Sequence, residues 1–342
     1  MRKILFLFLF FTFLSGCSAI RINFWKTKSL RQVSLKPIGV AVDSKLISQN
    51  PIYREVVLRE FNSITSENAL KMEIIHPERS VFDFSQVDVL LALADANKLR
   101  FRAHPLIWHR QLPAWLGEVK VKEFEKVFDA HISSLVKHCK AKAYSWDVVN
   151  EAFLRNGDYR PNIWFVAIGP SYIEKAFRIA HQHDPRAKLF YNDFQIEKVG
   201  PKFNAVYRML KELKDKGVPI DGIGLQAHLG INYNVRRDEL SEVIKRFSDL
   251  GLEVEITELD VAIPTNDSNQ QALKMQAATY QMIANVCNQF ASCRGITLWG
   301  LDDSHSWVPK EFPGLGQAML FDDSLQPKPI YTIFKNSLAA HE

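Results

Sequence analysis

The stretch YSWDVVNEAF, residues 144–153, places a carboxylate at the end of a strongly hydrophobic run. Valine and aromatic residues lead up to Glu151, and this composition predicts a buried β-strand. A lone ionised group is costly to bury, so a chain seldom leaves one in such a place unless it is paired or used. A second stretch, VEITELDVAI at 254–263, has the same form and carries Glu258. The two stretches predict a matched pair of glutamates.

The remainder of the chain alternates short apolar runs with longer amphipathic stretches. One amphipathic stretch, FNAVYRMLKELKDKG, ends at Gly217, as a helix C-terminus commonly does. Eight runs have the composition of β-strands: 37–42, 61–66, 99–108, 143–151, 188–194, 222–229, 253–260 and 295–303. Eight strands that are each followed by helix-forming sequence predict an α/β fold, a single (β/α)8 TIM barrel.

In such a barrel the C-terminal ends of the strands meet at one face, which carries the active site. Glu151 closes the predicted fourth strand and Glu258 the predicted seventh. Further polar and aromatic residues stand at the ends of other strands: Glu67, Asn68, Lys71, His104, Trp108, Gln111, Asn192, Asp193, Gln226, His228 and Trp299. We therefore expect these side chains to line one mouth of the barrel.

The N-terminus, MRKILFLFLFFTFLSGC, has a basic start followed by an apolar run that is too short to span a bilayer. It ends in Leu-Ser-Gly-Cys, which resembles a bacterial lipobox and implies lipidation of Cys17. The alternative is simple cleavage near Ala19. We assign 1–17 to a signal peptide, 18–36 to an N-terminal tether and 37–342 to the catalytic domain. The protein is then exported, either as a membrane-anchored lipoprotein of the periplasm or cell surface or as a secreted protein.

The overall composition, 47% hydrophobic and 24% charged, is that of a globular protein with a sizeable core. The net charge of +5 comes without a clustered basic run, so no nucleic-acid partner is expected. Cys139 falls on an apolar helical face, which predicts core packing, whereas Cys287 and Cys293 could close a small loop. No Cys/His grouping has zinc spacing, and neither a metal nor a cofactor is predicted.

Two carboxylates across a cleft suit the cleavage of a glycosidic bond, in which one protonates the leaving oxygen and the other supports the anomeric carbon. Trp108, Trp299 and Trp307 offer flat apolar faces to sugar rings and N–H groups to hydroxyls. The structural alternative is that the two glutamates form buried salt bridges with Lys71 or Arg102. For a lone histidine such as His104 or His228, the ordinary alternative is a hydrogen-bonded core residue.

The sequence resembles glycoside hydrolase family 10, the endo-β-1,4-xylanases. The matching segments occur in family order from about Pro37 to Ala340: FNSITSENALKMEIIHPE, FRAHPLIWHRQLPAWL, YSWDVVNEAF, GIGLQAHLGIN, VEITELDVAI, ITLWGLDDSHSWVP and LFDDSLQPKPIY. The resemblance implies a retaining mechanism with Glu151 as acid/base and Glu258 as nucleophile, acting on xylan or xylo-oligosaccharides.

The resemblance also assigns supporting residues. Asn150 would contact the sugar 2-hydroxyl, and Gln226 would lie near the acid/base and help to raise its pKa. His228 would hydrogen-bond Glu258 and be oriented by Asp260. The implied substrate-binding residues are Lys71, His104, Trp108 and Trp299 at the reacting sugar, Glu67, Asn68 and Gln111 at the next sugar out, and Trp307, which would limit room for a hexose hydroxymethyl group.

The resemblance further implies a Cys287–Cys293 disulfide. Three other functions compete with hydrolysis of xylan. A carbohydrate-binding protein without catalysis would not need an acid/base pair, and a metal-dependent hydrolase would need an H-x-H motif, whereas His104 and His109 are five residues apart. A β-1,4-glucan-specific glycosidase on the same barrel is compatible with the sequence.

Overall fold

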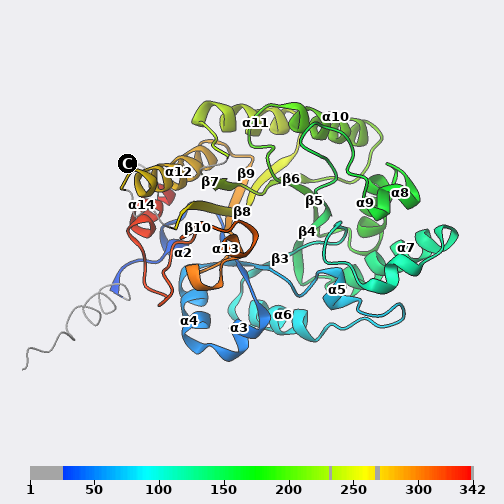
Figure 1. Cartoon of the computed structure of the whole chain (residues 1–342), viewed down its shortest axis with the longest axis horizontal. Helices are drawn as coiled ribbons and strands as arrows, with labels where there is room; N and C mark the ends of the chain where they lie inside the picture. Colours follow the sequence, from blue (N-terminus) through cyan, green and yellow to red (C-terminus); the bar gives the residue numbers. More distant parts are fainter. Residues whose placement is uncertain (1–25, 231–232, 266–269, 340–342) are drawn as a thin grey trace, which may run out of the picture.

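The computed structural model describes residues 26–230, 233–265 and 270–339. Eight parallel strands close into a barrel in the middle of the molecule, and helices surround them (Figure 1). The barrel strands are β1 (Ile38–Val42), β2 (Ser63–Ser66), β3 (Arg100–Ala103), β4 (Ala143–Asn150), β5 (Lys188–Asp193), β6 (Gly222–Leu225), β8 (Glu253–Pro264) and β9 (Cys293–Leu298). This arrangement confirms the predicted fold class.

The barrel closes because its first strand pairs with its last. β1 lies between β2 and β9 with parallel register on both sides, for example Val40 opposite Ile64 and Leu298. β8 in turn pairs with both β6 and β9. All five residues of β1 are buried. Strands covered on both faces need continuous apolar runs, which is the pattern that made these segments recognisable in the sequence.

Helices cover the outside of the barrel, and those between consecutive parallel strands return the chain to the start of the next strand. The helices of the fold are α2 (Leu30–Val33), α3 (Ser44–Gln49), α4 (Pro51–Glu60), α5 (Met72–Ile75), α6 (Ser85–Asn97), α7 (Val121–His138), α8 (Ile163–Ile168), α9 (Tyr172–His183), α10 (Pro201–Asp215), α11 (Arg237–Asp249), α12 (Gln270–Gln289), α13 (Val308–Glu311) and α14 (Pro329–Leu338), with short 3-10 segments η1 (Ala114–Glu118) and η2 (Asp303–His305). α10 ends two residues before Gly217, whose φ of 67° confirms the predicted helix end.

All eight strands differ in length from their predicted runs, and the third, sixth, seventh and eighth differ by three residues or more. The eighth, β9, ends at Leu298 and not at residue 303. The third is only four residues long, and the chain beyond Ala103 forms a loop. The sixth is interrupted at Ala227, where φ is 59°, and resumes as β7 (His228–Gly230). The seventh, β8, continues to Pro264 because β7 and β10 (Leu315–Gly316) pair with its far half. These extra pairings lie at the C-terminal end of the barrel.

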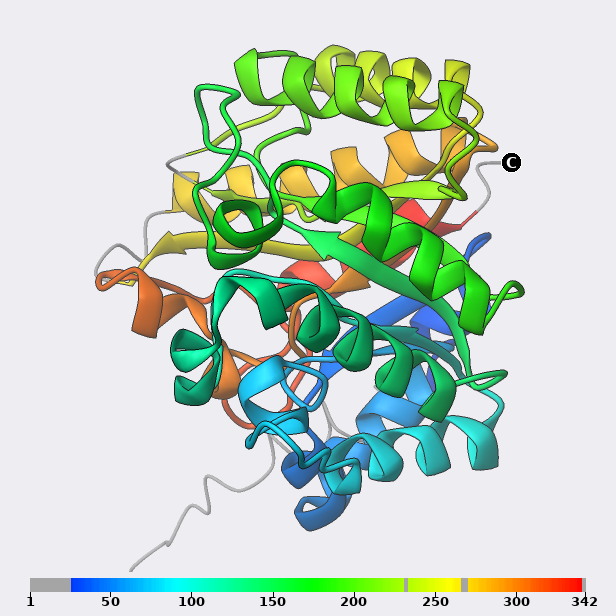
Figure 2. The same cartoon turned by 90° about the vertical axis from the view of Figure 1, so that its right-hand side faces the viewer.

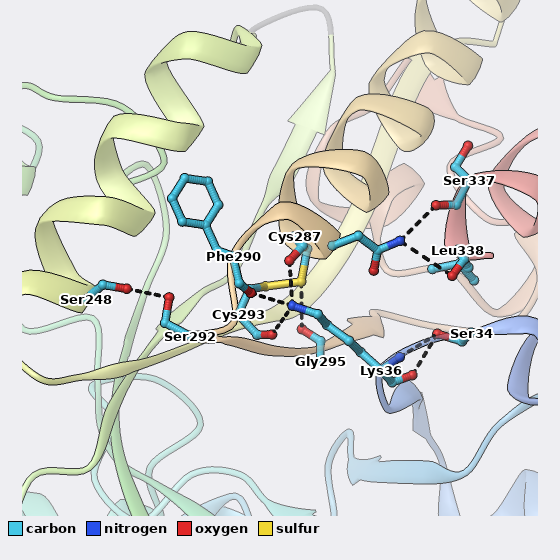
Figure 3. The surroundings of a disulfide bond; sticks show 11 residues. Ser34, Lys36, Ser248, Cys287, Phe290, Ser292, Cys293, Gly295, Ser337 and Leu338 are labelled. Atoms are coloured by element: carbon cyan, nitrogen blue, oxygen red, sulfur yellow. Dashed lines mark hydrogen bonds between the residues drawn. A yellow bond between two sulfur atoms is a disulfide. The ribbon is translucent and has the colours of Figure 1, made fainter. Parts of the chain in front are cut away.

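Part of the segment that we assigned to a tether belongs to the folded body. Leu30 is completely buried, and its N–H donates to Glu60 Oε2 at 2.8 Å. Lys36 Nζ donates to the backbone oxygens of Cys287, at 2.6 Å, and of Phe290 and Cys293 (Figure 3). The packed region therefore includes Leu30, seven residues before the predicted start of the domain at residue 37. The proposed lipidation site, Cys17, lies outside the described residues.

The cysteines of the barrel follow the expectation. Cys287 and Cys293 form a disulfide with a Cα–Cα distance of 5.3 Å, at the junction of α12 and β9 (Figure 3). Both are buried, so the bond lies beneath the surface. Cys139 is a buried free thiol, and burial raises its pKa to about 12. Of the helices in the described ranges, none combines the length and the apolar content that crossing a bilayer requires.

Candidate active site

Glu151 leaves the end of β4 in an unusual backbone conformation. Its φ is 60°, in the left-handed region that costs a non-glycine residue about 1–3 kcal/mol. The backbone is held on both sides: Glu151 N–H donates to Asn192 O at 3.0 Å, and Arg160 Nε donates to Glu151 O at 3.0 Å. In a regular strand, successive side chains point to opposite faces. The left-handed conformation of Glu151 breaks this alternation and so sets the direction of its side chain.

The Glu151 carboxylate accepts hydrogen bonds from two neutral amides, and His109 Nδ1 lies 3.8 Å from its Oε2. Asn150 Nδ2 lies 3.1 Å and Gln226 Nε2 3.2 Å from Oε1. Burial raises the pKa of Glu151, and the negative charges of Asp193 and Glu258 raise it further. The expected role of Gln226 in this shift is wrong, because an N–H that donates to a carboxylate favours the charged form and lowers the pKa.

Asp193 stands behind Glu151 as a buried, fully bonded carboxylate. Lys202 Nζ lies 2.6 Å from its Oδ1, and the Tyr191 hydroxyl donates to its Oδ2 at 2.6 Å. The same hydroxyl accepts the N–H of Ala152 at 3.0 Å, which ties the network to the residue after Glu151. Burial raises the pKa of Asp193, whereas Lys202 and the Tyr191 hydroxyl oppose this shift. The negative charge of Asp193 in turn favours the protonated form of Glu151.

Glu258 lies on β8 in different surroundings. Its Oε1 accepts a hydrogen bond from Asn192 Nδ2 at 2.6 Å, and its Oε2 lies 3.0 Å from His228 Nε2. The other ring nitrogen of His228 lies 2.9 Å from Asp260 Oδ2. Burial lowers the pKa of His228, but Asp260 and Glu258 outweigh this and raise it well above its ordinary value. An imidazolium therefore donates to both carboxylates.

A cluster of buried amides connects the two glutamates. Asn192 Nδ2 donates to Asn150 Oδ1 at 3.0 Å as well as to Glu258, and Gln226 Nε2 donates to the same Asn150 oxygen at 3.0 Å. Thr257 Oγ1 donates to Asn192 Oδ1 at 2.7 Å and fixes which way this amide faces. The sequence placed Asn192 at the mouth but gave it no role. Its link to both glutamates depends on β4, β5 and β8 coming together.

The structural alternative for the glutamates does not hold for Arg102. This buried side chain forms ion pairs with Asp147 and with Glu255, the latter at 2.8 Å. Asp147 Oδ2 also lies 2.9 Å from His104 Nδ1, so His104 is a hydrogen-bonded residue on one side. Its ring nevertheless borders the site, since Nδ1 is 3.9 Å from Glu258 Oε1. Asp147, in the stretch 144–153, thus positions the rings and charges of His104 and Arg102. Its place in an apolar run did not predict this role.

The expected sugar-binding residues after β2 and β3 form one group. Lys71 Nζ donates to Asn68 Oδ1 at 2.9 Å and lies 5.3 Å from the centre of the Trp108 ring. Burial lowers the pKa of Lys71, whereas Glu67 and Glu258 oppose the shift. Burial likewise raises the pKa of Glu67. The negative charge of Glu67 thus acts on the Lys71 ammonium and favours its charged form.

Gln111 fits its expected place less directly. Its φ is 50°, and its side-chain amide donates to Glu73 Oε1 at 2.7 Å. That hydrogen bond uses the group that would bind a sugar hydroxyl. Gln111 therefore reaches a ligand only with its remaining hydrogen-bonding capacity or after leaving Glu73.

The tryptophans of the eighth strand and its loop pack around His228. The His228 ring centre is 6.3 Å from Trp299 and 4.8 Å from Trp307, and Trp299 also meets His104 edge-on at 5.0 Å. Trp307 Nε1 donates to Asp260 Oδ2 at 2.8 Å. Trp299 is largely buried, with 8% of its surface exposed, and its ring contacts His104 and His228. In the part of the chain that the structure describes, no His, Cys, Asp and Glu side chains gather as ligands of a metal ion.

These features define a (β/α)8-barrel enzyme that works with a pair of carboxylates. They are the two buried glutamates, the amide cluster that joins them, and the tryptophans at the mouth of the barrel. The family comparison places it more narrowly. The model of glycosyl hydrolase family 10 matches residues 27–337, and the chain belongs to this family.

Characterised relatives and solved structures resemble the chain over most of its length. Endo-1,4-beta-xylanase B of Thermotoga neapolitana is 43% identical over 284 residues, which are 82% of this chain and 81% of the relative. Endo-1,4-beta-xylanase 5 of Pyricularia oryzae is 39% identical over 88% of this chain and 75% of its own. Xylanase 10B of Thermotoga petrophila, solved in complex with xylobiose, has a TM-score of 0.89 and 41% identity, and the match covers 92% of this chain and 98% of that one.

Proposed function

We propose that this chain is a retaining endo-1,4-β-xylanase, which hydrolyses internal β-1,4-xylosidic bonds of xylan by double displacement. Family membership supports the reaction, and one observation supports the assignment of roles. The amide cluster joins Glu151, whose pKa is raised, to Glu258, which contacts an amide and an imidazolium. Glu151 is the acid/base, because burial and two neighbouring carboxylates favour its protonated form. Glu258 is the nucleophile, because Asn192 and the His228 imidazolium stabilise its negative charge.

In the first step, a Glu258 oxygen attacks the anomeric carbon on the face opposite the leaving oxygen. The glycosidic C–O bond breaks, and the Glu151 proton passes to the leaving oxygen, so that a sugar hydroxyl departs. The product on the enzyme is a glycosyl ester of Glu258. Because this ester carries no charge, one cause of the raised pKa of Glu151 disappears.

In the second step, Glu151 is therefore ionised and acts as a base. It takes a proton from water as the water oxygen attacks the anomeric carbon and the bond to Glu258 breaks. Two inversions leave the configuration unchanged, and both glutamates return to their starting states. Such a mechanism expects the two carboxyl groups to lie about 5–5.5 Å apart.

The remaining site residues act on the sugar or on the glutamates. Asn150, next to Glu151, contacts the 2-hydroxyl of the reacting sugar, and Asp260 orients His228. Contacts to the reacting sugar come from Lys71, His104, Trp108 and Trp299; those to the next sugar come from Glu67, Asn68 and Gln111; and Trp307 restricts the room for a hexose hydroxymethyl group.

A substrate comparison tests the reaction. Purified protein is assayed side by side on xylan, carboxymethylcellulose and mixed-linkage glucan, and we expect new reducing ends on xylan with a rapid fall in chain length. Release from the glucans alone would identify a glucan-specific glycosidase. Binding of xylan without any cleavage would identify a carbohydrate-binding protein.

The proposed location is outside the cytoplasm. The N-terminal sequence supports export with lipidation of Cys17, so that a membrane holds the barrel through its N-terminus. Stable anchoring then rests on several acyl chains, since one chain binds only weakly. We expect detergent to be needed for extraction and Cys17→Ser to give an uncleaved or released form. Recovery of the wild type in the soluble fraction with an N-terminus at or beyond Ser18 would contradict the anchor.

A further inference from the structure

An ion pair joins two loops at the mouth of the barrel. Arg110 lies on the loop after β3, two residues beyond Trp108, and Glu311 is the last residue of α13 in the segment after β9. Arg110 Nη1 lies 3.1 Å from Glu311 Oε1, and Nη2 lies 3.3 Å from Oε2. Two parallel contacts of this kind fix the geometry as well as the distance.

The two loops come from strands that are not neighbours. In the barrel, β1 and β2 stand between β9 and β3. The ion pair therefore reaches past the ends of these two strands, and β2 is the strand that leads into Glu67, Asn68 and Lys71. In Figure 2 the segments that hold α13 (orange) and η1 (teal) lie at the same end of the molecule. The pair spans the part of the mouth to which these sugar-binding residues belong.

Each residue of the ion pair contacts a tryptophan of the candidate site. The Arg110 guanidinium carbon lies 6.0 Å from the centre of the Trp108 ring, which Lys71 also approaches. On the other side, Glu311 N–H donates to the backbone oxygen of Trp307 at 3.2 Å. The ion pair therefore limits how far apart the loop with Trp108 and the loop with Trp307 can move, and breaking the pair removes this limit.

We propose that the Arg110–Glu311 pair is a specificity-determining strap over the sugar-binding residues that follow β2, and that it disfavours xylose units carrying a branch. This inference rests on the proposed xylanase function. An unbranched xylose ring presents only hydroxyl groups to the strap. A branch on the ring bound there needs the space between the two loops, so the pair has to open.

The strength of the strap follows from its exposure. The side chains of Arg110 and Glu311 are 52% and 39% exposed. Exposed ion pairs hold weakly, so the bias against a branched ring is about two- to fivefold. Salt screens such a pair, so the bias decreases as ionic strength rises.

The test compares kcat/KM for a linear xylo-oligosaccharide with kcat/KM for the same backbone bearing one arabinose branch. We expect Glu311→Ala to raise the branched-to-linear ratio about two- to fivefold. The single changes Arg110→Glu and Glu311→Arg should do the same, and their combination should return the ratio to the wild-type value. Glu242→Ala serves as the matched control, because it removes an exposed ion pair with Arg246 on α11. Thermal unfolding shows whether each variant is folded.

The wild-type enzyme supplies a second measurement without any substitution. Its branched-to-linear ratio should rise with salt, and the ratio of Glu311→Ala should not. A ratio that is the same in wild type and Glu311→Ala, or a double variant no closer to wild type than the single variants, would overturn the strap. Failure of the wild type to cleave the linear substrate would instead overturn the xylanase function on which it rests.

Discussion

The ends of β4 and β8 each carry a buried glutamate, but they hold it in different ways. Glu151 stands where β4 stops, in a left-handed conformation, with neutral amides at its carboxylate. Glu258 stands within a strand that continues to Pro264, and it contacts an imidazolium and an amide. At Glu151, burial is the first cause of the raised pKa, and the negative charges of Asp193 and Glu258 add to it. The difference shows that two buried carboxylates of one site can have quite different hydrogen-bond partners.

The largest expected effect separates the two glutamates directly. Glu258→Ala should be inactive on every glycoside, because no covalent intermediate forms. Glu151→Ala should lose about 10²–10⁴-fold activity on xylan, yet react rapidly with an aryl xylobioside whose acidic phenol leaves without protonation. Added azide should release a β-glycosyl azide from this variant. An α-glycosyl azide, or azide rescue of Glu258→Ala instead, would reverse the roles or exclude the retaining mechanism.

A smaller effect is expected from the amide cluster. Asn192→Ala removes the donor at Glu258 Oε1 and should lower kcat about 10- to 100-fold, the range for a hydrogen bond to a charged group. Thr257→Val leaves Asn192 in place but removes the hydroxyl that orients it, so its loss should be smaller and in the same direction. Steady-state kinetics with an activated aryl substrate measure both variants. If Thr257→Val is the more damaging, Asn192 is not the group that supports Glu258.

The pH profile of activity reports the protonation of Glu151. Since the protonated form of Glu151 is required, activity should fall as pH rises through its pKa, which burial and the charges of Asp193 and Glu258 have raised. Gln226→Leu removes a donor that favours the charged form, so the alkaline limb of kcat/KM should move to higher pH, by about one unit. The same profile in the wild type is the control. A shift to lower pH would mean that Gln226 does not act through the ionised form of Glu151.

The smallest expected effect on activity comes from the disulfide at the other end of the barrel. Reduction of the Cys287–Cys293 disulfide should lower the free energy of unfolding by about 2 kcal/mol, because it closes a short loop, and should leave kcat unchanged at 25 °C. The Cys287→Ala/Cys293→Ala double variant should not respond to the reductant. Chemical denaturation with and without reductant measures the stability change. A loss of activity in the reduced, folded protein would show that the two ends of the barrel are coupled.

The sequence revealed the strands because they depend on local patterns, and the same patterns predicted which side chains lie at the mouth of the barrel. Continuous apolar runs mark strands that are buried on both faces, and polar residues at their ends mark the mouth. Arg102 shows the limit of this reasoning, since its partners Asp147 and Glu255 lie on other strands and only the fold brings them together. The same holds for Asn192 between the two glutamates, and for Arg110 and Glu311, which are 201 residues apart.

Backbone geometry was the second limit. Nothing in the letters Asn150-Glu151-Ala152 signals a φ of 60°, because the turn is fixed by hydrogen bonds from Arg160 and to Asn192. The long β8 was also underestimated. Its extension depends on pairing with β7 and β10, which come from distant parts of the chain.

The closure of the barrel has a consequence for how the protein is made. β1 finds its second partner only in β9, and Lys36 finds the carbonyl oxygens that it binds only beyond residue 286. A ribosome has therefore synthesised more than four-fifths of the polypeptide before the first strand has both neighbours. Until then the edges of β1 and β8 remain available to other chains, as unpaired strand edges generally are. A chain truncated before β9 should accumulate as aggregate, and a catalytically competent mouth should arise only when synthesis is nearly complete.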